Sequence, residues 1–161
     1  MSSRTRYIRE GIVAGLIGAA VVAVWFLIYD AARGHPFRTP ALLGAATFRG
    51  VDNAAAVSIS PHLVVEYTVL HGVVFVVFGA IAASLFGLVD RDRRVLFAVF
   101  MLFACFEVAF LCAVAVVSGV LYGELRPWSI LSANALAAVT MLAILFRRHR
   151  HSPAELLVSG E

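Results

Sequence analysis

The chain has 161 residues, of which 61% are hydrophobic and 14% are charged. Soluble globular domains carry about 25% charged residues, so this composition excludes an ordinary soluble domain and indicates an integral membrane protein. The net charge is only +3, and membrane proteins gain basic residues in their cytoplasmic loops, so nucleic acid is not expected as a partner. The length allows about four spans in a single membrane domain, residues 1–161.

The first predicted span is residues 11–29. It carries Gly11, Gly15, Ala19 and Ala23 at four-residue spacing, which gives a face of small side chains that another helix can approach closely. The apolar run is longer than the core of a signal peptide and lacks a clear cleavage site beside it. We therefore expect it to be retained as a membrane helix.

The outer loop, residues 30–60, is the one long connection in the prediction. Thr39 as the N-cap, with Pro40 at the first helical position, is a helix start signal, and Gly50 is a stop signal. These signals predict a short interfacial helix, which would lie against the membrane surface or over the mouth of the bundle.

Three further spans are predicted at residues 61–88, 95–120 and 128–146, followed by a tail at 147–161. The expected fold is all-α, an up-down four-transmembrane-helix bundle. Three arginines lie in each of the N-terminal segment, the turn after the second span and the tail, whereas the opposite side carries four. The positive-inside rule then places both termini in the cytoplasm and the 30–60 loop outside.

Four polar residues within the spans form a predicted intramembrane cluster: Glu66, His71, Glu107 and Asn134. At 1.5 Å per helical residue, His71 and Glu107 lie roughly 15–18 Å from the ends of their spans, near the midplane. Glu66 and Asn134 fall in the outer half. Hydrocarbon solvates such groups poorly, so they are expected to face a cavity, a partner or a ligand on the outer side.

The outer rim is predicted to hold Asp30, His35 and His62. His62 and Glu66 are four residues apart and share a helix face. That spacing suits a metal, but a site would need further ligands, and hydration of the pair is the alternative. They are weak candidates, and no metal site is firmly predicted.

His71 and Glu107 leave alternatives open. Haem ligation through His71 would need a second histidine from another chain. A neutral His71 hydrogen-bonded between helices is the structural alternative. Glu107 can be a protonated structural partner or a proton-accepting site in transport. No cofactor is predicted, and haem or a metal remains a lesser alternative.

Motifs for catalysis are missing from the sequence. There is no phosphate-binding glycine loop, no nucleophile elbow and no CxxC. The two cysteines, Cys105 and Cys112, are seven residues apart in one apolar run and are interpreted as packing residues. An enzyme is therefore not expected.

Four short motifs together resemble a group of small bacterial four-span proteins of no assigned function: WFLIYD at 25–30, GHPFRTP at 34–40, YTVLH at 67–71 and ANALA at 133–137. The resemblance implies a bacterial inner-membrane location and carries no activity.

Two functional hypotheses follow from the sequence. The first is a non-enzymatic accessory or assembly subunit of a larger membrane complex, for example one for electron transfer or photosynthesis. Its partners would be the lipid bilayer and other membrane subunits or further copies of itself. The second is a small oligomeric transporter, or a metal- or haem-handling protein, that uses the outward-facing His/Glu cluster.

Overall fold

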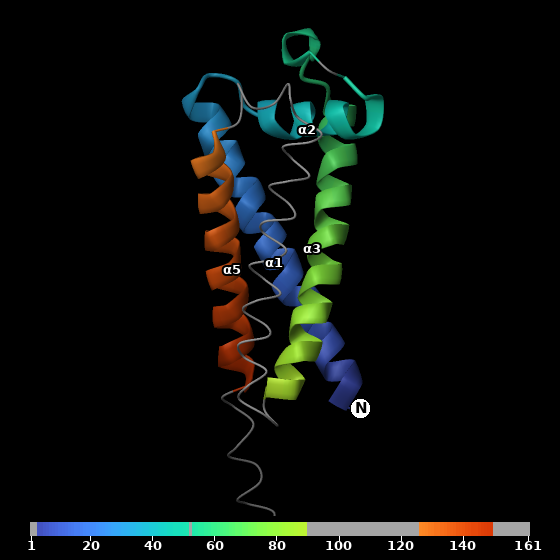
Figure 1. Cartoon of the computed structure of the whole chain (residues 1–161), viewed down its shortest axis with the longest axis vertical. Coiled ribbons are helices and arrows are strands. Elements are labelled where there is room, and N and C mark those ends of the chain that lie inside the picture. The colour runs from blue at the N-terminus through green and yellow to red at the C-terminus, as the bar shows by residue number, and fades with distance from the viewer. Residues whose placement is uncertain (1–2, 52, 90–125, 150–161) are drawn as a thin grey trace, which may run out of the picture.

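The computed structural model describes residues 3–51, 53–89 and 126–149. Within these ranges every regular element is a helix: α1 (Ser3–Ala32), α2 (Arg38–Arg49), the short 3-10 helix η1 (Ala54–Ala56), α3 (Pro61–Val89) and α5 (Pro127–His149). Figure 1 shows α1, α3 and α5 running along the long axis, with α2 lying across one end. We call this end, which carries α2, the outer end.

Three of these helices are long and apolar enough to cross a membrane, at Tyr7–Ala32, Pro61–Leu85 and Pro127–Leu145. They match the predicted spans 11–29, 61–88 and 128–146. The expectation of a helical, multi-pass membrane protein is therefore confirmed to the extent that three helices have the length and apolar composition of membrane spans. The remaining predicted span, 95–120, lies outside the described residues.

Helices α1 and α3 touch through glycine. A Cβ atom added to Gly11 would lie 2.5 Å from the carbonyl oxygen of Gly79, and one added to Gly15 would lie 2.9 Å from the Cα of Val76. These separations leave no room for a side chain, so the two backbones are in direct contact. Gly11 and Gly15 of the small face predicted on the first span therefore receive α3, whereas Ala23 of that face is exposed.

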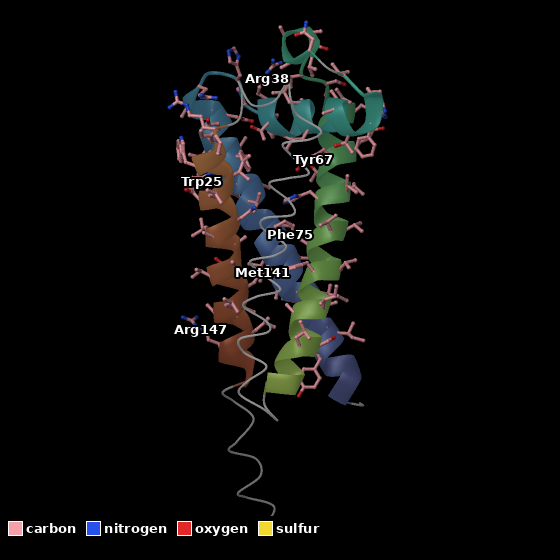
Figure 2. The ribbon with its side chains drawn as sticks, viewed as in Figure 1. Trp25, Arg38, Tyr67, Phe75, Met141 and Arg147 are labelled. Carbon is pink, nitrogen blue, oxygen red and sulfur yellow. The ribbon has the colours of Figure 1, made fainter. Side chains whose placement is uncertain are left out.

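Helices α1 and α5 pack through a different set of residues. Val22 on α1 is buried with Ala133 and Ala137 on α5, and Phe75 of α3 packs against the same cluster. Farther from the outer end, a Cβ atom on Gly18 would lie 2.6 Å from the sulfur of Met141. Figure 2 shows Phe75 and Met141 lying between the helices. Helix α1 thus contacts both of the other long helices.

Helix α2 begins two residues earlier than the sequence indicates, at Arg38 and not at Pro40. Its N-cap is Phe37, which makes no side-chain capping hydrogen bond, and Thr39 lies within the first turn. The interpretation of Thr39 as the N-cap is wrong, because its hydroxyl hydrogen-bonds to a residue of α1. The stop signal is confirmed: Gly50 is the C-cap, with φ 59°, a left-handed conformation that glycine adopts at little cost.

Candidate functional site

The outer end of the molecule is held by a buried carboxylate. Asp30, in the last turns of α1, accepts a 2.7 Å hydrogen bond from the backbone N–H of Thr39 and another of 2.7 Å from its hydroxyl. The two residues are only 3% and 2% exposed. Asp30 therefore satisfies an N–H in the first turn of α2 and fixes the junction between α1 and α2.

Arg38, the residue before Thr39, holds the segment that follows α2. Its guanidinium donates one hydrogen bond of 2.6 Å to the carbonyl of Val57 and one of 2.8 Å to the carbonyl of Ala54. Figure 2 shows Arg38 at the outer end, beside α2. The planar fork of arginine suits two acceptors at once, so this side chain ties η1 to the start of α2.

A third polar group joins the other end of α2 to α3. Arg49 pairs with Glu66 at 3.1 Å, and it also lies 3.4 Å from Nδ1 of His62. The His62 Nε2 is 3.5 Å from the Glu66 carboxylate. The predicted His62 and Glu66 pair is thus present, and a cation already occupies the place where a metal would have to bind.

His71 lies deeper, on the face of α3 that meets α1. Its ring stacks on Tyr67, with centroids 5.9 Å apart, and tilts against Phe75 at 4.6 Å. The imidazole also lies against the backbone of Ala19. Its Nε2 atom is buried and has no hydrogen-bond partner among the described residues, which is costly for a polar atom.

The predicted cluster of four residues is divided in this part of the structure. Glu66 belongs to the outer group with Arg49, whereas His71 faces α1 one and a half turns further along α3. Asn134 on α5 is half-buried and engages a neighbour. Glu107 lies outside the described residues.

The outer rim is divided in the same way. Asp30 is buried against Thr39, while His35 is exposed in the turn between α1 and α2. Neither joins His62. Among residues 3–51, 53–89 and 126–149, no group of three or more histidine, cysteine, aspartate or glutamate side chains is placed to hold a metal ion.

Aromatic rings surround the outer ends of α1 and α5. Tyr29 packs edge to face against Phe26 and Trp128, with centroids 6.2 Å and 6.0 Å away. The Arg33 guanidinium lies 4.7 Å from the centre of the Tyr29 ring. The indole of Trp25 donates a 3.3 Å hydrogen bond to the Ser129 hydroxyl. Such rings are typical of a membrane–water boundary.

Sequence reasoning overlooked Glu10 and Arg38. Glu10 precedes the predicted span 11–29, yet it lies within the apolar helix Tyr7–Ala32 and is only 6% exposed. Its position directly before Gly11, the first residue of the predicted small face, is a usable signal. In the sequence, Arg38 enters only as one of the four arginines used to predict orientation. No local pattern points to its distant carbonyl acceptors.

The comparisons with known proteins give no match. No protein-family model matches the chain, and neither the curated proteins nor the solved structures include one that is significantly similar. The interpretation of the chain therefore depends on its own residues.

Proposed function

We propose that the chain is a non-enzymatic accessory or assembly subunit of a larger membrane complex, and that α3 is the helix that contacts the other subunits. The observation that carries this proposal is the outward face of α3. It bears a row of branched apolar side chains at four-residue spacing, each between 47% and 60% exposed: Val65, Val69, Val73, Val77 and Ile81.

This row has the properties of a helix-docking surface. It extends from residue 65 to residue 81, or about 24 Å of helix, and it carries no charge. Branched side chains have few rotamers to lose when a partner helix binds. Gly72, beside the row, is also open, because a Cβ atom there would meet nothing within 4 Å. At the glycines of the α1–α3 contact, by contrast, the backbone of the opposing helix occupies the space beside the glycine.

The polar groups of the outer end support a structural role over catalysis. Asp30, Arg38 and Arg49 each hold one segment of the chain to another, through contacts of 2.6–3.1 Å. A carboxylate or guanidinium engaged in this way is not available to a substrate. We assign these groups to the rigidity of the outer end.

The proposal includes a fourth span at 95–120, with both termini in the cytoplasm of a bacterial inner membrane. Support comes from the chain path: α3 ends at the end of the molecule where α1 begins, and α5 begins at the outer end (Figure 1). This arrangement of the described helices supports a return crossing between α3 and α5. The arginine distribution supports the orientation, and the similarity to small bacterial four-span proteins supports the location.

The test is site-specific photo-crosslinking in native membranes. Benzoylphenylalanine at Val73 samples the α3 row, and the same group at Val24, which is 54% exposed on α1, is the matched control. We expect Val73 to crosslink to other membrane subunits and the gently extracted protein to have a native mass above that of a monomer. A monomer that crosslinks only to lipid at both sites would overturn the proposal.

His71 favours a second candidate, a small transporter or a metal- or haem-handling protein. A buried Nε2 without a partner among the described residues is an atom that can bind a proton, a metal or a haem iron. Replacing His71 and Glu107 by glutamine should abolish metal content, visible absorbance or transport while leaving the helices folded. If the double variant behaves like the natural chain, the two side chains serve packing alone.

A further inference from the structure

The C-terminal half of α2 lies directly on the first turn of α3. A Cβ atom on Gly44 would be 2.6 Å from the carbonyl oxygen of Leu63, and Ala41 and Ala45 beside it are buried. Gly44 therefore marks the face of α2 that is turned toward the membrane spans.

Phe48 belongs to that same face. It follows Gly44 by four residues, and residues four apart in a helix lie one above the other. Nevertheless its side chain is 41% exposed. In Figure 1, α2 crosses the end of α3 and continues beyond it. The last turn of α2 is thus an overhang whose lower face has no helix beneath it among the described residues.

The surroundings of this overhang are set by α3. The exposed row on α3 starts at Val65, which is 60% exposed and directly precedes Glu66, the partner of Arg49. Because α3 is apolar enough to span a membrane, the lower face of the overhang, at the outer end of α3, lies at the level of the outer leaflet. The Phe48 ring has no polar atom and continues the apolar surface of α3 to its outer end.

We propose that Phe48 is a lipid anchor, with its ring in the outer leaflet at the boundary between headgroups and acyl chains. Aromatic and aliphatic side chains on one face of an interfacial helix bind membranes in this way. The adjacent Arg49, paired with Glu66 at 3.1 Å, connects the last turn of α2 to α3, which keeps the ring on the membrane side of α2. The proposal requires only that α3 spans the bilayer, and not the accessory role.

The test places a nitroxide spin label on the full chain in phosphatidylcholine–phosphatidylglycerol vesicles. The label is attached at Phe48→Cys, in a background with Cys105→Ala and Cys112→Ala. Two reference sites are Ala55→Cys, exposed on η1, and Val73→Cys, exposed midway along α3. Collisions with oxygen report lipid, and collisions with a water-soluble nickel chelate report solvent.

We expect the label at position 48 to favour oxygen over the chelate, as at position 73 and unlike position 55. Chelate collisions equal to those at position 55 would place Phe48 in water and overturn the proposal. Exclusion of both reagents would show protein covering the ring, and would also overturn it. Exclusion of both reagents at position 73 alone would show protein covering the α3 row, which concerns the accessory role and not Phe48. Failure of the lipid-anchor proposal and failure of the accessory role are therefore distinguishable.

A second measurement keeps the native cysteines. Phe48→Trp preserves an aromatic ring at the anchor, and Ala55→Trp is the control at the water-exposed site. In vesicles that contain lipid brominated near the headgroup, we expect the added emission of Phe48→Trp to be quenched several-fold more than that of Ala55→Trp, after subtraction of the signal of the natural chain. Equal quenching of the two added tryptophans would contradict the proposal.

Discussion

The carboxylate of Asp30 and the N–H and hydroxyl of Thr39 form a pair of 2.7 Å hydrogen bonds that joins the end of α1 to the start of α2. Both residues are almost completely buried. The direction in which α2 leaves α1 is therefore set by two bonds to one side chain, in addition to the packing of α2 on α3.

Replacing Asp30 by alanine should strongly destabilise the outer end. Hydrogen bonds to charged groups contribute about 1.5–3 kcal/mol each, and the variant leaves the Thr39 donors buried and unpaired. Unfolding by sodium dodecyl sulfate in mixed micelles would measure the loss. Glu66→Gln is the control: it breaks a partly exposed ion pair, for which we expect less than about 1 kcal/mol. Equal losses in the two variants would refute the role given to Asp30.

The Arg38 fork predicts local protection of residues 53–57. Arg38→Ala removes the donors to Val57 and Ala54, and Arg38→Lys keeps the charge without the planar fork. We expect amide hydrogen exchange in this segment to become about tenfold faster or more in both variants, which corresponds to one hydrogen bond to a charged group. Full protection in Arg38→Lys would mean that charge alone holds the segment.

Two glycines of α3 should differ in how much a larger side chain lowers the stability of the protein. Gly79→Val places atoms inside the contact with Gly11 and Gly15, whereas Gly72→Val enters open space within the described part of the structure. The first variant should lose the α1–α3 contact and unfold at a much lower detergent concentration. The second should stay close to the natural chain in stability. Tolerance of valine at position 79 would contradict the direct backbone contact.

At position 37, glycine should give a more stable protein than alanine does. The Phe37 φ of 66° is left-handed, a conformation that costs a residue with a side chain about 1–2 kcal/mol. Phe37→Gly and Phe37→Ala both remove the ring, but only the first relieves the backbone strain. We expect the glycine variant to be more stable than the alanine variant by about 1 kcal/mol. Thermal unfolding of the two proteins in the same detergent gives the comparison.

The sequence predicts the long helices well because their signals are local. An apolar run of sufficient length is enough to locate α3, and Gly50 is enough to end α2. The roles of Thr39 and Arg38 could not be predicted in this way. Their partners lie 9 to 19 residues away along the chain, and only the packing of α2 across the outer end brings these groups together.

The predicted polar cluster shows the same limit. Residue depth along a helix is readable from the sequence, and it correctly places Glu66 nearer the outer end than His71. Depth alone does not give rotation about the helix axis, which directs Glu66 to Arg49 and His71 to α1. Burial of Glu10 is also a tertiary effect, because a carboxylate at the start of a span is normally expected to face water.

The position of α1 has a consequence for biogenesis. This helix packs closely on both α3 and α5, while α3 and α5 barely touch each other. Chains are synthesised from the N-terminus, and N-terminal elements fold first. The helix that the other two require is therefore in the membrane before either of them emerges from the ribosome. Helix α3 can complete its glycine contact while the last third of the chain is still being translated, and α5 then joins an existing pair.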